Sequence, residues 1–140
     1  MEHRNKLGRS ALRALAAAAV VLLSTAAAPA GAGSDSIDSD LMQSLEDHQK
    51  DLASNLGLAD ARAAGANAAE LLRGLREVQA WYEARPALAE GVELSRKAVE
   101  HAARVRQQID RGDLGGAAAS ATDLGRSCKA CHAVFKKDSR

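Results

Sequence analysis

The chain has 140 residues, of which 46% are hydrophobic and only 2% aromatic, and its formal net charge at pH 7 is +1. Alanine, leucine, glutamate, arginine and glutamine dominate, which favours helices and gives almost nothing to a β-sheet. The sequence has no strongly basic stripe, which argues against nucleic acid as a partner.

The first 32 residues are typical of an export signal. Basic residues between Arg4 and Arg13 precede a short apolar run at 14–23, and small residues with two A-x-A sequences follow, at 28–30 and 30–32. The apolar run is shorter than the ~20 residues that span a bilayer. We therefore expect a cleaved signal peptide over 1–32 and a periplasmic protein, with an uncleaved anchor as the alternative.

The remaining residues, 33–140, are enough for one domain. Removing the four Lys and Arg and the one Glu of the signal leaves 15 basic and 17 acidic residues, a net charge of −2. Four segments repeat their hydrophobic residues with a period near 3.6, which predicts four α-helices. The first runs from about Ser36 to Leu56 with Gly57 as its stop, the second starts near Asp60, the third opens at Pro86, and the fourth follows Asp113.

The residues predicted to face inward are, helix by helix, Leu41, Leu45, Leu52 and Leu56; Ala64, Ala68, Leu71, Leu75, Val78 and Tyr82; Leu88, Val92, Ser95, Val99, Ala102 and Ile109; and Leu114, Ala117, Ala121, Leu124, Cys128, Cys131 and Phe135. Connections of only a few residues make successive helices antiparallel neighbours, so we expect an all-α, up-down-up-down four-helix bundle. Its large apolar side chains are few, and a buried prosthetic group would supply the missing apolar volume.

Both cysteines lie in the sequence C-K-A-C-H at 128–132. On the predicted last helix both thiols fall on the inward stripe, and His132, four residues after Cys128, projects on nearly the same side. Two other interpretations fit less well. A redox-active pair usually sits at the start of a helix beside a strand, whereas this pair lies in the last turns of a helix. A zinc site needs about four ligands, and no second C-x-x-C or H-x-x-x-H sequence is present. C-x-x-C-H is the signature of covalent haem attachment, in which the thiols form thioethers and the histidine reaches the iron. The export signal favours haem over the other two interpretations.

A C-x-x-C-H sequence on the last helix of an antiparallel bundle resembles the cytochrome c′ group, the class II c-type cytochromes, and the resemblance covers about 33–140. It implies that Cys128 and Cys131 carry one covalent haem c and that His132 is the proximal iron ligand. Pairing of two copies through the first two helices is common in that family, and the sequence leaves a homodimer open.

Members of the family often carry Tyr and Arg shortly after the histidine, but Phe135 and Lys136 stand at these positions here. An arginine that pairs with the haem propionates is therefore not expected, and Lys129, Lys136 or Lys137 would serve instead.

The group opposite His132 separates two functions. If a protein side chain fills the sixth iron position, the iron cannot easily bind a substrate, and its function is one-electron transfer with redox partner proteins. If that position is open and apolar, the haem would bind NO or CO. Enzyme chemistry of the peroxidase type is disfavoured, because acid and base must converge at one site and Glu46 and Asp47 point away from the side of His48. Glu46 and its charged neighbours indicate an ordinary exposed helix face.

Counting equal rises along the antiparallel first and last helices places residues 37–41 level with His132, and Met42 is the nearest ligand-type side chain. His48 lies about 9 Å further along, at about 1.5 Å per residue. A thioether also suits iron opposite histidine and raises the reduction potential. We therefore expect an electron carrier, not an enzyme, with Met42 as the sixth ligand. His48 and an open site are the alternatives.

Overall fold

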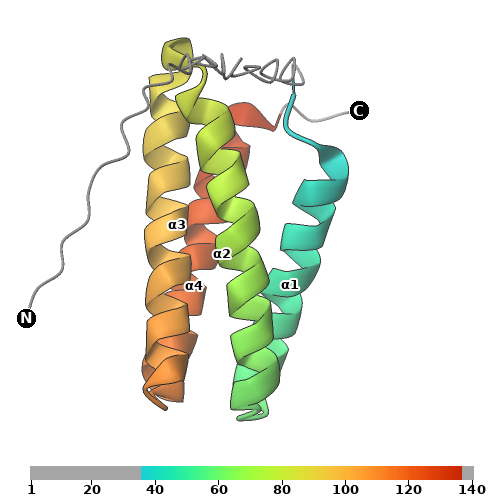
Figure 1. Ribbon diagram of the computed structural model, residues 1–140, viewed down its shortest axis with the longest axis vertical. Helices are drawn as coiled ribbons and strands as arrows, with labels where there is room; N and C mark the ends of the chain where they lie inside the picture. Colours follow the sequence, from blue (N-terminus) through green and yellow to red (C-terminus); the bar gives the residue numbers. More distant parts are fainter. Residues whose placement is uncertain (1–35, 137–140) are drawn as a thin grey trace, which may run out of the picture. The chain divides into compact units, whose positions relative to one another are not determined.

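The computed structural model describes residues 36–136, so the expected signal peptide over 1–32 lies outside the described residues. This part of the chain is all-helical and holds no strand. Figure 1 shows its elements: α1 (Ser39–Gly57), α2 (Ala61–Glu83), the short 3-10 helix η1 (Pro86–Leu88), α3 (Ala89–Asp110) and α4 (Leu114–Phe135). For residues 36–136, the prediction of an all-α fold with four α-helices is confirmed. Within residues 36–136, no helix combines the length and the apolar character needed to cross a membrane.

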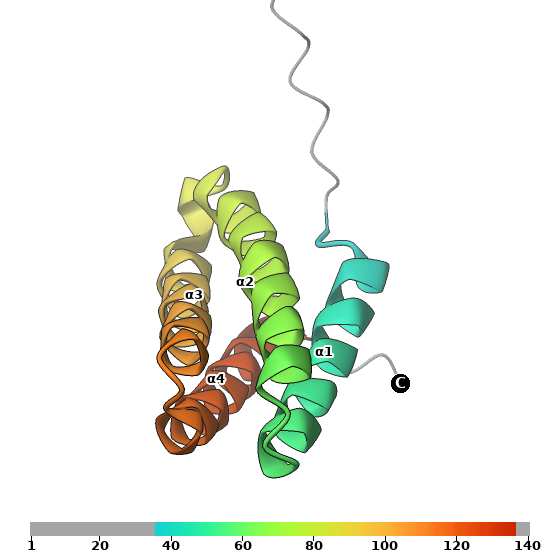
Figure 2. The same cartoon turned by 60° about the horizontal axis from the view of Figure 1, so that its bottom comes forward.

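The helices pack as neighbours in chain order. α1 packs along α2, α2 along α3 and α3 along α4, whereas α1 and α4 meet over a smaller surface. Figures 1 and 2 show that the three connections between the helices lie at alternate ends of the helical group. The N-terminal end of α1 stands apart from α3.

Aspartates begin three of the helices. The Asp60 carboxylate accepts a hydrogen bond from the backbone N–H of Ala63 at 2.9 Å, and the Asp113 carboxylate accepts one from Gly116 at 2.8 Å. These caps confirm the predicted starts of α2 and α4, because each satisfies a backbone donor that has no partner inside the helix. The first helix begins at Ser39 and not at Ser36, because Asp38 caps it through the N–H of Asp40.

The turn between α1 and α2 differs from the prediction that Gly57 stops the helix. Gly57 is the last residue of α1, and the left-handed conformation falls on Ala59, whose φ is 56°. The Asp60 N–H donates to the carbonyl of Asn55 at 2.9 Å and so closes the helix end around Ala59. The reversal therefore comes directly before the cap of α2, two residues after the glycine.

The core combines a few large side chains with many alanines. Leu52, Leu71, Leu124 and Val105 are its largest fully buried side chains. The buried alanines are Ala64, Ala68, Ala98, Ala102, Ala117 and Ala121. The positions predicted to face inward on α1, α2 and α4 are all buried or half-buried. Most of the alanines lie toward the α1–α2 and α3–α4 connections, so their small side chains let the helices approach closely at that end.

The third helix also keeps its predicted inward face, because Ser95, Ala102 and Ile109 are buried. Pro86 opens η1, α3 itself begins at Ala89, and the valines at 92 and 99 are only half-buried. The buried positions also include Gly91, Ala98 and Val105, which the sequence analysis did not predict. At Gly91 the ring of Tyr82 leaves no room for a side chain, because a Cβ there would lie 2.2 Å from its Cδ1 and Cε1 atoms. The ring therefore needs a neighbour without a side chain, and Gly91 of α3 provides it.

Replacing Gly91 by alanine should therefore destabilise the chain. Overpacking costs about 1–3 kcal/mol, against a gain of roughly 1 kcal/mol from the better helix propensity of alanine. We expect a lower urea midpoint by circular dichroism. Gly65→Ala is the matched control, because its Cβ would meet Ile109 at an ordinary 3.6 Å, and it should raise the midpoint. Equal midpoints for the two variants would contradict the close Tyr82–Gly91 packing.

Candidate cofactor site

Two adjoining cavities lie at the end of the bundle opposite the alanine-rich end. Their volumes are about 600 Å³ and about 410 Å³, and sites for small molecules and cofactors span roughly 300–1,000 Å³. Both cavities are lined by Met42, Glu46, Cys131, His132 and Lys136. They therefore meet between the N-terminal half of α1 and the C-terminal end of α4.

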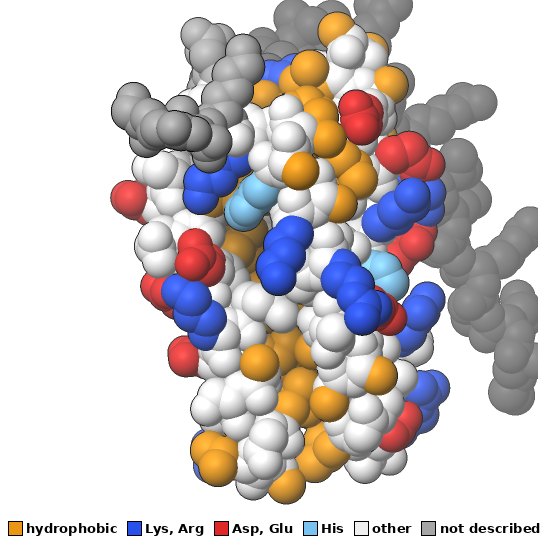
Figure 3. Space-filling model, turned by 180° about the vertical axis from the view of Figure 1, so that it is seen from behind, with side chains coloured by type: hydrophobic (Ala, Val, Ile, Leu, Met, Phe, Trp, Pro, Cys, Tyr) orange, Lys and Arg blue, Asp and Glu red, His pale blue; other side chains and the backbone are white. Residues whose placement is uncertain are grey.

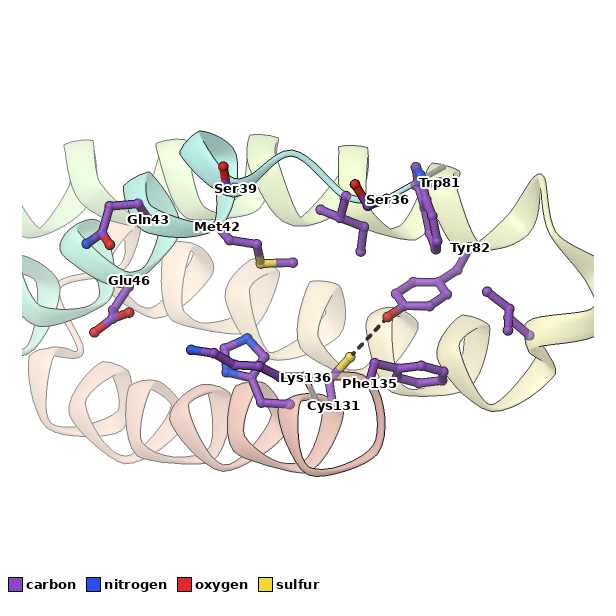
Figure 4. A pocket seen from close by; sticks show the side chains of 13 residues that line it. Ser36, Ser39, Met42, Gln43, Glu46, Trp81, Tyr82, Cys131, Phe135 and Lys136 are labelled. Atoms are coloured by element: carbon purple, nitrogen blue, oxygen red, sulfur yellow. Dashed lines mark hydrogen bonds between the residues drawn. The ribbon is translucent and has the colours of Figure 1, made fainter. Parts of the chain in front are cut away.

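The larger cavity has an aromatic wall, which Figure 4 shows from close by. The rings of Trp81 and Tyr82 meet edge to face with centroids 5.1 Å apart, and Phe135 lies 5.1 Å from Tyr82. The Arg85 guanidinium stacks 3.8 Å from the centre of the Trp81 ring. These contacts fix the wall at the end of α2, because pairs of aromatic rings and cation–π contacts add to the energy of burial.

The smaller cavity has aliphatic walls and a basic rim. Its apolar lining comes mainly from Leu45, Leu71, Leu75, Val78, Leu94 and Ala98. Cys128 lines only this smaller cavity, whereas Cys131 lines both cavities. Lys129 and Lys136 lie on its rim; Lys137, the third lysine proposed for the propionates, lies outside the described residues. In Figure 3, which views the opposite side from Figure 1, basic side chains lie across a partly exposed apolar band.

Both cysteines are half-buried free thiols near the end of α4. Burial raises the pKa of the Cys128 thiol above its ordinary value. Burial also raises the pKa of Cys131, although a hydrogen bond with the Tyr82 hydroxyl, 3.7 Å from the sulfur, acts in the opposite direction. A redox-active pair needs a lowered thiol pKa, so this site does not support that interpretation.

The structure brings Met42 to the C-x-x-C-H sequence. Leu41 and Leu45 pack on α2 so closely that a Cβ on Gly74 would lie 3.2 Å and 2.8 Å from their methyl carbons. With those two residues held on α2, the side chain of Met42 extends toward α4, as Figure 4 shows.

His48 lies elsewhere. Its Nδ1 atom is 3.0 Å from the side-chain oxygen of Asn67, it is half-buried, and it lines neither cavity. Across residues 36–136, no three His, Cys, Asp or Glu side chains are grouped closely enough to hold a metal ion. The protein side chains alone therefore do not form the cluster that the zinc interpretation needs.

Glu46 is a site residue that the sequence analysis missed. Its carboxylate is exposed, as expected, but it lines both cavities. Lys50, 2.9 Å away, holds the pKa of Glu46 below its ordinary value, and the nearby charges of Lys136 and His132 on α4 act in the same direction. The sequence feature that could have identified Glu46 is its position four residues after Met42, which places both residues on the same flank of α1.

These residues fit a flat, covalently held cofactor. Cys128 and Cys131, one turn apart, face cavities with apolar walls. The imidazole of His132 comes from α4 and the thioether of Met42 from α1, and lysines lie at the rim. Haem c is the group with those requirements. No protein-family model matches the chain, and a comparison with curated proteins finds no match either.

The raised thiol pKa values predict that the haem-free, reduced chain loses stability in alkali. An unfolded cysteine ionises near pH 8.5, whereas burial keeps Cys128 protonated to higher pH in the folded chain. The stabilisation is complete below about pH 8.5 and is lost as the pH rises through the folded pKa. We expect the urea midpoint to fall from about pH 7.5 to about pH 10, and to fall less steeply in Cys128→Ala. Identical pH profiles for parent and variant would show that Cys128 is not the cause.

Proposed function

We propose that the chain is a periplasmic c-type cytochrome, an antiparallel up-down-up-down bundle of the cytochrome c′ kind, that carries one covalent haem c and transfers single electrons. One observation carries the proposal: Cys131, His132 and Met42 line both of the adjoining cavities, and Cys128 lines the smaller one. The haem supplies an iron that accepts and releases one electron.

Each residue of the site has a defined task in this proposal. Cys128 and Cys131 hold the haem against α4, and His132 is the proximal ligand. Met42 approaches from α1 as the sixth ligand. The apolar walls keep water from the iron and so favour a raised reduction potential. Lys129 and Lys136 offer cations to the propionates at the rim.

Electron transfer fits this site better than enzyme chemistry does. The one histidine of α1, His48, is hydrogen-bonded to Asn67 and lines neither cavity. It therefore does not join Glu46 in an acid–base pair beside the iron. The partners of the proposed carrier are other one-electron redox proteins.

Binding of NO or CO is the second candidate function, and a specific observation favours it. Met42 lines both cavities, so it has space on either side. Methionine is unbranched and flexible. If its side chain turned away from the iron, the sixth position would be open in an apolar pocket of the kind that takes a small gas molecule.

Covalent attachment is the first test of the proposal. The full chain, exported by a host that matures c-type cytochromes, should keep its haem after extraction with acid and acetone, and its mass should rise by one haem. The double variant Cys128→Ala, Cys131→Ala should release all haem into the organic phase, because thioethers are the only covalent link. Release of all haem from the parent chain would refute the proposal.

Met42→Ala distinguishes the two functions. We expect the ferric parent to show the long-wavelength charge-transfer band of a methionine–iron bond, as other c-type cytochromes do, and the variant to lose it and bind CO in the ferrous state. His48→Ala is the control and should keep the band, because His48 bonds to Asn67 away from the cavities. A parent without the band that binds CO readily would favour gas binding.

A further inference from the structure

The two cysteines have different surroundings. The Tyr82 hydroxyl lies 3.7 Å from the sulfur of Cys131, a distance typical of a weak hydrogen bond to sulfur, and Figure 4 draws this contact across the cavity. Cys128 lines the aliphatic cavity. Among the described residues, no side chain makes a hydrogen bond to the sulfur of Cys128. Among the described side chains, a polar partner is therefore found for Cys131 and not for Cys128.

Tyr82 is itself held rigidly. It is only 2% exposed, and its ring lies against the bare backbone of Gly91. Trp81 meets the ring edge to face, and Phe135 packs on it from α4. A hydroxyl on a ring held by these neighbours is a fixed point, so its hydrogen bond restricts where the Cys131 sulfur lies.

We propose that Tyr82 is a positioning residue for Cys131: its hydroxyl holds the sulfur in the cavity, so that the second thioether depends on Tyr82 and the thioether at Cys128 does not. The inference rests on the proposed function, because it concerns attachment of the same haem.

The chemistry makes the position of the sulfur important. In each attachment, a thiol adds across a vinyl group of the haem: a sulfur–carbon bond forms, the thiol hydrogen goes to the other vinyl carbon, and the carbon–carbon double bond becomes single. No electron is gained or lost overall. Once one thioether has formed, the second addition is intramolecular, and its rate depends on how well the remaining sulfur is placed. After the reaction the sulfur has no hydrogen, and the Tyr82 hydroxyl can still donate to it.

Tyr82→Phe is the test, because it removes the hydroxyl and keeps the ring that packs on Gly91. Ser95→Ala is the matched control. Ser95 is also 2% exposed and lines the smaller cavity, but its hydroxyl donates to the carbonyl of Val92 in its own helix at 3.0 Å. Both variants should keep the helix content of the parent by circular dichroism.

The first readout uses the reduced full chain without haem. Three-bond couplings measured by NMR should show one dominant χ1 rotamer for Cys131 in the parent and in Ser95→Ala, and rotamer averaging in Tyr82→Phe. A Cys131 rotamer that Tyr82→Phe leaves unchanged would overturn the inference and would leave the proposed function intact.

The second readout uses the haem-loaded protein. In Tyr82→Phe, the fraction of Cys131 still open to alkylation should rise several-fold, and the pyridine haemochrome band should move to longer wavelength, because an unreacted vinyl group stays conjugated with the ring. The parent and Ser95→Ala should be attached at both cysteines. Complete double attachment in Tyr82→Phe would overturn the inference, whereas a parent chain without covalent haem would overturn the proposed function.

Discussion

The shortage of large apolar side chains shapes the rest of this structure. Near the α1–α2 and α3–α4 connections, buried alanines such as Ala64 and Ala117 let the helices approach, and Leu52 is completely enclosed there. At the opposite end the aromatic side chains of α2 and α4 hold the helices apart, and α1 meets α4 over a smaller surface. A bundle closed at one end and hollow at the other follows from where small and large side chains stand along the helices.

Tyr82 links this packing to the chemistry of the site. Its ring requires Gly91 on α3, while its hydroxyl reaches Cys131 on α4. The pKa of the hydroxyl is raised by burial and by the nearby thiol, so it stays protonated and able to donate at neutral pH. One side chain therefore takes part both in the core and in the proposed haem site, and a change there affects stability and attachment together.

Features encoded by neighbouring residues were predictable from the sequence. The four helices followed from their period, and the starts at Asp60 and Asp113 from the capping chemistry of aspartate. The burial of Gly91 was not predictable, because it depends on how the Tyr82 ring meets Gly91 across two helices. The C-x-x-C-H sequence is contiguous and readable without a fold, whereas the place of Glu46 beside α4 appears only when the helices are assembled.

The choice between the two candidate functions depends on α1. Leu41 and Leu45 hold its N-terminal half on Gly74 of α2, and that contact sets how far Met42 reaches toward α4. On the far side α1 faces the cavities, which Glu46 lines together with His132 and Lys136 of the α4 end. A bound haem would add the apolar volume that the chain lacks between α1 and α4, and a group that binds only the folded state stabilises it. Contact with the haem would hold α1 in place, and Met42 would then be held close to the iron. The packing of α1 would therefore decide between electron transfer and gas binding.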